Sequence, residues 1–403
     1  MSIPSRLRHI HLHHHHRHNF STSILSPDSS TPLTSKQKTR AALNLLKIEK
    51  NPERVLEICA AASLTPENHL DRVTLSEAVK KLSAAGHLDG LRRLIEEDLK
   101  PRLDLRNGRF LSHAMVLYGQ ANMLDDAIRT FDRMEEEQRV PRTVKSLNSL
   151  LFACIVAKNY KEVKRIYLEF PKIYSIIPNI DTYNLVIKAF CESGSSSSVY
   201  SVLDEMDRNS VKPNATTMKT MLSGFYKEEK FEEVGKVLKL MEERYKMHPS
   251  LSTYNVRIVS LCKLKRSAEA KALMEGMICR GRKPNSVTYM HLIFGFCREG
   301  NVEEGERLFQ EMKKKGYTPN SDCYFTLIHF LSEAGKFESA LSFAKESMAK
   351  AWFPNFTTMK NLVNGLASVS KVDDAKELIK EIKEKFSASS DKWDEIEAGL
   401  TQE

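Results

Sequence analysis

A proline that returns at an almost fixed interval constrains the fold of this chain more than any other feature. Steps of 35, 36, 35, 35 and 35 residues separate the successive prolines Pro178, Pro213, Pro249, Pro284, Pro319 and Pro354. Asn follows the proline in five of these six places, and Ser250 follows it in the other. A fixed period of this length is the signature of stacked repeats, so we expect one elongated array rather than separate globular domains.

Each period contains apolar residues at helical spacing twice, separated by a polar turn. In the stretch from Ser286 to Asn320 the turn is "REGN", and the second apolar run ends at "KKKG", where basic residues and Gly fit the end of a helix. Proline then prevents the helix from continuing. Because one such helix pair cannot bury its apolar faces alone, the pairs must stack. The sequence therefore predicts an all-α fold, a superhelical α-solenoid of stacked helix-turn-helix repeats of about 35 residues.

Four regions are expected along the chain. Residues 1–33 are predicted to form a mitochondrial targeting peptide and flexible leader, because they contain Arg6, Arg8 and Arg17 and no acidic residue before Asp28. Residues 34–71 form an N-terminal helical cap, residues 72–390 an array of about nine repeats, and residues 391–403 a C-terminal capping helix or tail. The expected repeats start near Arg72, Asn107, Val144, Ile180, Ala215, Leu251, Ser286, Ser321 and Phe356.

Composition narrows the class of protein. The formal net charge of +9 favours polyanionic partners, although the leader supplies part of it. No apolar run reaches the length of about 18 residues that a membrane span needs, so no membrane association is expected. The histidines of the leader are interpreted as low-complexity sequence rather than as a metal site.

No constellation of catalytic or metal-ligating residues occurs. The chain has no phosphate-binding glycine loop followed by Lys and Ser or Thr, no Cys-x-x-Cys and no His-Glu-x-x-His. Cys191, Cys262 and Cys297 fall at the same place in their repeats, on the first helix, where a small apolar side chain packs. We therefore expect neither an enzyme, nor a cofactor, nor a metal, nor a small-molecule substrate.

The phrases "DTYNLVIKAFCESG", "STYNVRIVSLCKLK" and "VTYMHLIFGFCREGNVEEGERLFQEMKKKGYTPN" resemble pentatricopeptide repeats of the plain, non-editing class. The resemblance covers Val144 to Ser390 well and Arg72 to Arg142 weakly. The tetratricopeptide repeat, a protein-binding relative, is the alternative, but it lacks the Pro-Asn ending. The segment from Thr31 to Leu82 also resembles the start of a plant subgroup that associates with the mitochondrial ribosome. The resemblance implies an RNA-binding protein of the mitochondrial matrix.

In this family, the fifth residue of a repeat and the residue after the closing proline can read one base together. The fifth residues here are Asn148, Asn184, Lys219, Asn255, Met290, Phe325 and Lys360. The closing residues of the first six repeats are Asn179, Asn214, Ser250, Asn285, Asn320 and Asn355. Only three repeats pair Asn with Asn, which in the family implies a pyrimidine. For the asparagines of the "TYN" phrases, Asn184 and Asn255, a role in a turn or at a helix start stays open. Specific recognition of a long transcript is therefore disfavoured.

Basic residues at the ends of successive first helices form another candidate site. Lys227, Lys263 and Arg298 stand there, and Lys265 and Arg266 follow in the next turn. Stacking would align these side chains as a track for a phosphate backbone. The alternative is that they complement the helix dipoles and face water.

Two functional hypotheses of different class follow, and a third is less favoured. The first is a structural component of the mitochondrial ribosome, the small subunit above all, which contacts ribosomal RNA and ribosomal proteins and supports translation. The second is a free-standing protein that binds single-stranded organellar transcripts. The third is an adaptor that binds only proteins, and its assemblies would be indifferent to nuclease.

Overall fold

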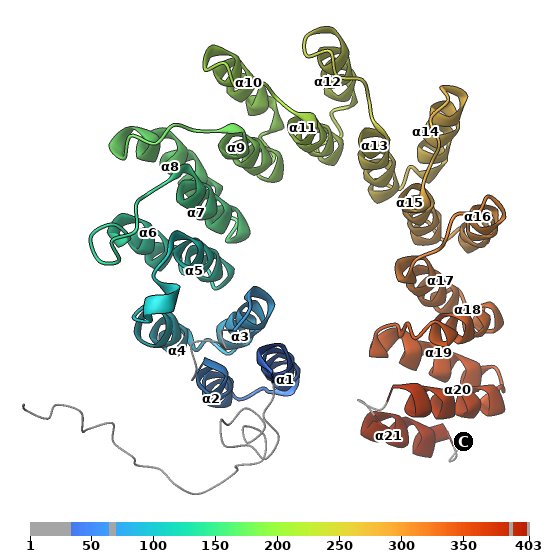
Figure 1. Ribbon diagram of the computed structural model, residues 1–403. Helices are drawn as coiled ribbons and strands as arrows, with labels where there is room; N and C mark the ends of the chain where they lie inside the picture. The colour runs from blue at the N-terminus through green and yellow to red at the C-terminus, as the bar shows by residue number, and fades with distance from the viewer. Residues whose placement is uncertain (1–33, 64–69, 387–389, 401–403) are drawn as a thin grey trace, which may run out of the picture. The chain divides into compact units, whose positions relative to one another are not determined.

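The structure, a computed structural model, describes residues 34–63, 70–386 and 390–400, and every regular element in these ranges is a helix (Figure 1). The predicted leader, residues 1–33, lies outside the described residues. The chain divides into two compact units, one up to Ala189 and one from Phe190, so that the division falls within one helix. Among the described helices, none combines the length and the apolar character that crossing a bilayer requires.

The first unit consists of helix pairs in sequence order. Its elements are α1 (Ser35–Ile48), α2 (Pro52–Ser63), α3 (Arg72–Ala84), α4 (Leu88–Arg93), the π-helix η2 (Leu94–Leu99), the 3-10 helix η3 (Leu103–Leu105), α5 (Gly108–Gln120), α6 (Leu124–Arg133), α7 (Val144–Val156), α8 (Tyr160–Ile173) and the greater part of α9 (Ile180–Glu192). The first helices of successive pairs pack on one another, α1 on α3, α3 on α5 and α5 on α7.

The second unit repeats the same arrangement more regularly. Its elements are the 3-10 helix η4 (Ser196–Ser198), α10 (Val199–Arg208), α11 (Ala215–Lys227), α12 (Phe231–Glu243), α13 (Leu251–Lys263), α14 (Ser267–Cys279), α15 (Ser286–Arg298), α16 (Val302–Lys314), α17 (Ser321–Glu333), α18 (Phe337–Ala349), α19 (Phe356–Ser368), α20 (Val372–Lys385) and α21 (Ser390–Leu400). The first helices α11, α13, α15, α17 and α19 pack in a row, and each is flanked by its second helix. The prediction of an all-α fold of stacked helix pairs is confirmed.

The Pro-Asn phrase marks the start of α9, α11, α15, α17 and α19 because the Asn after proline caps each of these helices. Asn285 is the N-cap of α15: its Oδ1 accepts from the backbone N–H of Thr288 at 3.0 Å, and its own N–H donates to Thr288 Oγ1 at 3.1 Å. This reciprocal pair satisfies two groups that a helix end would otherwise leave unpaired. Ser250 caps α13 in the same way. The first helices from α7 to α19 consequently begin at the residues expected from the proline period.

Glycine and cysteine allow neighbouring first helices to approach closely. A Cβ added to Gly295 on α15 would lie 2.5 Å from Cys262 Sγ on α13, and one added to Gly224 on α11 would lie 2.3 Å from Cys191 Sγ. These cysteines are buried, and burial raises the pKa of Cys262 to about 11 and that of Cys191 to about 12. The interpretation of these cysteines as small packing residues is confirmed.

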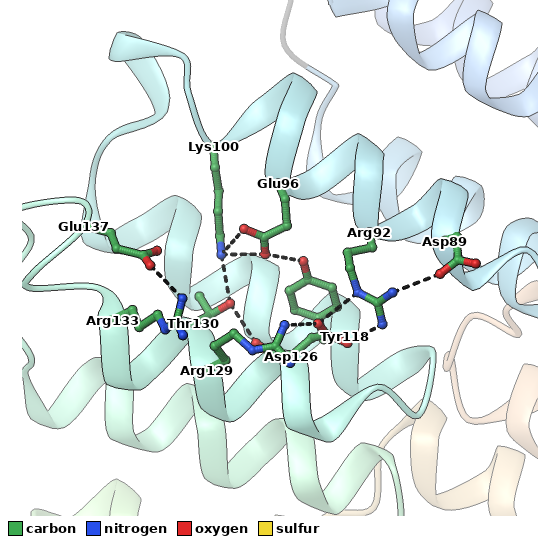
Figure 2. Close-up of polar contacts among 10 residues, drawn as sticks. All are labelled: Asp89, Arg92, Glu96, Lys100, Tyr118, Asp126, Arg129, Thr130, Arg133 and Glu137. Atoms are coloured by element: carbon green, nitrogen blue, oxygen red, sulfur yellow. Dashed lines mark hydrogen bonds and ion pairs between the residues drawn. The ribbon is translucent and has the colours of Figure 1, made fainter.

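A buried polar cluster stabilises the less regular pairs of the first unit (Figure 2). Lys100, whose side chain is only 8% exposed, donates from Nζ to both carboxylate oxygens of Glu96 at 2.7 and 2.8 Å and to Thr130 Oγ1 at 3.0 Å. Tyr118 donates its hydroxyl to Glu96 at 2.5 Å, and burial raises the pKa of Tyr118. These bonds connect η2 with α5 and α6.

The neighbouring carboxylate of Asp126 is also shielded from solvent and paired. Arg92 reaches it with Nε and Nη2, each at 3.1 Å, and Arg129 reaches it with Nη1 at 3.0 Å. Removing one member of such a buried set leaves an uncompensated charge, so the cluster fixes how α4 sits against α6. The contacts of Arg92 with Asp126, of Lys100 with Thr130 and of Tyr118 with Glu96 join different elements, so no local sequence signal marks them.

Candidate nucleic-acid interface

Two of the basic residues at the ends of first helices, Lys227 and Arg298, bind carbonyl groups of the preceding pair. Lys227 Nζ donates to the carbonyl of Glu192 at the end of α9, at 3.1 Å, and Arg298 Nη1 donates to the carbonyl of Lys263 at the end of α13, at 2.9 Å. Last-turn carbonyls lack partners within their own helix, and a cation there also complements the helix dipole. Both side chains nevertheless remain exposed, as does Lys263, and keep their charge toward solvent.

The two basic residues of the turn after α13 differ from each other. Lys265 is exposed and has a left-handed backbone with φ of +57°, which ends the helix. Arg266 pairs with Glu269 at 2.6 Å, and its guanidinium lies 4.1 Å from the ring centre of Phe231. Since Glu269 and Phe231 belong to second helices, the structure places Arg266 apart from the row of first-helix cations.

The candidate base-reading asparagines form a network that joins one repeat to the next. In the first unit, Asn148 Nδ2 donates to Asn179 Oδ1 at 3.1 Å, and Thr182 donates its hydroxyl to Asn148 Oδ1 at 2.7 Å. In the second unit, Asn255 Nδ2 donates to Asn285 Oδ1 at 3.3 Å and Thr288 donates to Asn255 Oδ1 at 2.8 Å. The fifth residue therefore lies beside the N-cap of the following first helix.

These contacts cap helices, and they leave hydrogen-bonding groups of the amide side chains available to a ligand. An amide side chain carries two N–H groups and an oxygen with two lone pairs, and the network uses one of each on Asn255. Asn214 is the N-cap of α11 and holds the backbone N–H of Thr217 at 3.0 Å. Asn184 lies half-buried on α9. Asn179, Asn214 and Asn285 thus start their helices as N-caps, whereas Asn184 and Asn255, for which the sequence left a helix-start role open, lie at the fifth position of α9 and α13. Base contact stays a prediction for all of them.

Charge is divided between the two helices of each pair in the second unit. The first helices α11, α13 and α15 contain no acidic residue, and their basic residues are Lys219, Lys227, Arg257, Lys263 and Arg298. The second helices α12, α14 and α16 each contain more acidic than basic residues. Of the basic set, Arg257 was not singled out from the sequence, although counting charge helix by helix would have found it.

Lys81 makes a contact like those of Lys227 and Arg298, and the sequence analysis did not identify it. Lys81, in the last turn of α3, donates from Nζ to the carbonyl oxygens of Lys47 and Glu49, each at 2.9 Å. It lies in the first unit, where the repeats are weakest in sequence. In the part of the chain that the structure describes, no group of three or more His, Cys, Asp or Glu residues could hold a metal ion.

Comparison with known proteins agrees with the geometry. The PPR repeat family matches residues 178–227, 249–297 and 284–333, the pentatricopeptide repeat domain matches residues 143–193, and the PPR repeat matches residues 114–138, 216–245 and 357–385. Together these stretches cover more than half of the chain. The family consists of repeats that bind rather than catalyse, in agreement with the expectation of a non-enzymatic protein.

This chain aligns with only part of each relative. A mitochondrial pentatricopeptide repeat-containing protein of Arabidopsis thaliana is 52% identical over 212 residues, which are 52% of this chain and 52% of that protein. The small ribosomal subunit protein mL103 of Arabidopsis thaliana is 30% identical over 277 residues, 67% of this chain and 65% of that protein. The chain thus matches between about half and two thirds of the length of these two relatives.

Among solved structures, the crystal structure of the maize pentatricopeptide repeat protein PPR10 is similar over 92% of this chain and 55% of that one, with 19% identity and a TM-score of 0.41. The repeat matches, the helix pairs of the proline period and the capped first helices point the same way. This chain belongs to the pentatricopeptide repeat family.

Proposed function

We propose that this protein binds RNA without catalysis, and that the first helices of the second unit hold the phosphate backbone. The observation that carries the proposal is the charge of α11, α13 and α15, five basic residues with no acidic one among them. Phosphate contacts of this kind supply affinity and orientation without reading sequence. Lys227 and Arg298 are held at the helix ends by carbonyl groups, so their positive charges are positioned before RNA arrives.

Reading of bases is limited to a few positions. Only Asn148 with Asn179, Asn184 with Asn214, and Asn255 with Asn285 offer paired amides. A good base contact gives about 1 to 3 kcal/mol of discrimination, so three separate pairs do not define a long unique site. We infer that shape and charge dominate the binding.

The cellular setting that we propose is the mitochondrial matrix, and within it the ribosome. The basic, acid-poor composition of residues 1–33 fits an import sequence, and one relative is named a mitochondrial protein. The relative mL103 is named a protein of the small ribosomal subunit. A structural component that contacts folded ribosomal RNA and ribosomal proteins has little need of a long base code, which this chain lacks.

A free-standing protein that binds single-stranded transcripts for stabilisation or translation is the second candidate. The retained Asn pairs favour it, because Asn148 and Asn255 keep polar groups that an unstacked base could meet. Sedimentation of mitochondrial extract separates the candidates. Migration with a ribosomal subunit that is lost on RNase treatment or magnesium removal supports the first, and a small RNase-sensitive particle supports the second. A complex unaffected by RNase would contradict both.

The phosphate-binding role is tested by replacing Lys227, Lys263 and Arg298 together with Ala. If each contacts one phosphate, the slope of log K against log salt for single-stranded RNA should become shallower by about 2, since each contact contributes about 0.7. The matched control replaces Lys236, Lys239 and Lys314, which lie on the second helices α12 and α16. Equal effects of both triple variants would refute the assignment to first helices.

The weight of base reading is tested separately. Asn184→Ala should leave the affinity for RNA within about threefold, because one amide pair contributes little beside the charged contacts. Fluorescence anisotropy with a labelled RNA measures this. Loss of binding in this single variant would restore base reading as the main source of affinity.

A further inference from the structure

Two neighbouring first helices, α15 and α17, present apolar side chains where other first helices of the second unit present polar ones. The fifth residue of α11, α13 and α19 is Lys219, Asn255 and Lys360, respectively. The fifth residue of α15 is Met290, and that of α17 is Phe325. Neither side chain has a donor or a strong acceptor for the edge of a base.

The same helices carry further aromatic rings, four residues after Met290 on α15 and five residues after Phe325 on α17. Phe294 on α15 and Phe330 on α17 lie edge to face, with ring centres 6.3 Å apart and planes at 69°. The His329 ring lies 4.8 Å from that of Phe330. Met290, Phe294, Phe325, His329 and Phe330 are all half-buried, so each also contacts solvent. These five residues are called the aromatic patch below.

The aromatic patch continues the row in which the base-reading positions lie. Asn255 Nδ2 is 3.3 Å from the cap residue Asn285 of the next first helix. Met290 Sδ is likewise 3.6 Å from Nδ2 of the cap residue Asn320. The thioether of Met290 therefore occupies the place that an amide occupies in the preceding repeat, beside the N-cap of the following helix.

Positive charge is also present on α15 and on the first helices beside α15 and α17. Burial lowers the pKa of His291 on α15, and the positive charge of Lys263 lowers it further, so Lys263 lies close to α15. Arg298 is exposed at the end of α15, and Lys360 is exposed on α19. The acidic residues of α17 are Asp322, at its start, and Glu333, which is 3.5 Å from His329. A phosphate backbone would avoid Asp322 and follow Lys263 and Arg298.

We propose that the aromatic patch stacks one or two unpaired bases of the bound RNA, without regard to their identity. The inference rests on the proposed RNA binding and specifies that α15 and α17 contact the bases of the RNA. Every base has a π face, and stacking on aromatic side chains next to cations is the means by which single strands are held without a sequence code. The polarizable thioether of Met290 adapts to such a ring at its edge.

An apolar protein segment is the other class of ligand that a surface of this kind accepts. The charge favours RNA, because α13 and α15 carry Arg257, Lys263 and Arg298 and no acidic residue. A protein segment would have to be acidic as well as apolar to match. If such a segment occupies the aromatic patch instead of bases, Phe325→Ala will not change the binding of RNA in the following experiment.

The test compares two RNA 12-mers of equal charge, one with bases and one with abasic ribose at every position, by fluorescence anisotropy on the full chain. Phe325→Ala should weaken binding of the base-bearing strand by about tenfold and leave binding of the abasic strand unchanged, since only stacking is lost. The matched control is Phe231→Ala, because Phe231 is a partly exposed phenylalanine on the second helix α12. That control should bind both strands as the unaltered chain does.

Phe325→Trp protects the test against misfolding of the alanine variant. A tryptophan in the aromatic patch should keep the affinity for bases, and its emission should be quenched by the base-bearing strand and not by the abasic one. The two native tryptophans, Trp352 and Trp393, supply the background, which is measured on the unaltered chain.

The outcomes separate the two proposals. If the chain binds the two strands equally well and Phe325→Ala changes neither, binding by charge stands and stacking at the aromatic patch is overturned. The aromatic patch would then be available to an apolar protein segment. If the chain binds neither strand, the proposed function itself fails, and the stacking proposal falls with it.

Discussion

Replacing Gly295 by Ala tests how closely neighbouring first helices must pack. Gly295 lies within α15, facing α13, and a methyl group there would lie 2.5 Å from Cys262 Sγ, 2.5 Å from Ser267 Oγ and 2.7 Å from Cys262 Cβ. All three distances are far shorter than van der Waals contact. Ser267 cannot move freely, because its hydroxyl donates to Glu299 at 2.5 Å.

The size of the effect follows from two opposing terms. Forcing an extra methyl group into a well-packed core costs about 1 to 3 kcal/mol. Alanine favours a helix interior over glycine by about 1 kcal/mol. Because three contacts with two residues must be relieved, we expect the unfolding free energy to fall by about 1 to 2 kcal/mol.

The same substitution at Gly235 provides the control. Gly235 lies in the interior of α12, and no atom would lie within 4 Å of a Cβ there. Gly235→Ala should therefore raise the stability by about 0.5 to 1 kcal/mol. Urea denaturation followed by circular dichroism compares the midpoints of both variants with that of the unaltered chain. A midpoint for Gly295→Ala equal to or above that of the unaltered chain would refute the close approach of α13 and α15.

Other consequences concern caps, thiols and the buried cluster. Asn285→Ala should lower the unfolding free energy by about 1 kcal/mol in urea, whereas Asn285→Ser should cost little, since Ser250 caps α13 equally. Iodoacetamide at about pH 8 should modify Cys279, the exposed cysteine, and spare the six buried ones; mass spectrometry showing several modified sites in the folded chain would contradict this. Because burial raises the pKa of Cys262 to about 11 from 9.0, the unfolded thiol loses its proton first, so stability should hold below about pH 9 and fall above it in urea titrations at increasing pH. Lys100→Ala should cost about 1 to 3 kcal/mol and speed amide exchange in η2, because it removes the cation that pairs with Glu96; unchanged exchange would contradict the role of the cluster.

Local signals explain why the helix pairs could be predicted from the sequence. A cap such as Asn285 and its partner Thr288 lie three residues apart, and the αL turn at Gly300 or Gly316 is set by single residues with φ of +85° and +80°. Such features need no knowledge of distant contacts. The positions of the first helices from α9 to α19 therefore followed from the proline period.

Contacts between repeats could not be predicted in the same way. The bonds of Asn255 with Asn285 and of Lys227 with the carbonyl of Glu192 depend on how one pair packs on the next, which no local pattern encodes. The same holds for Lys100 and its partners around η2, because the repeats there depart from the consensus. The binding of phosphate by Lys227, Lys263 and Arg298 depends on contacts with RNA, and it stays a prediction.

We expect RNA to lie along the first helices and not along the second. Ultraviolet crosslinking of the full chain to a uridine-rich RNA, followed by mass spectrometry of the crosslinked peptides, tests it most directly. We predict crosslinked nucleotides on peptides from α11, α13, α15 and α17. Crosslinks confined to α12, α14 and α16 would contradict the binding of RNA along the first helices.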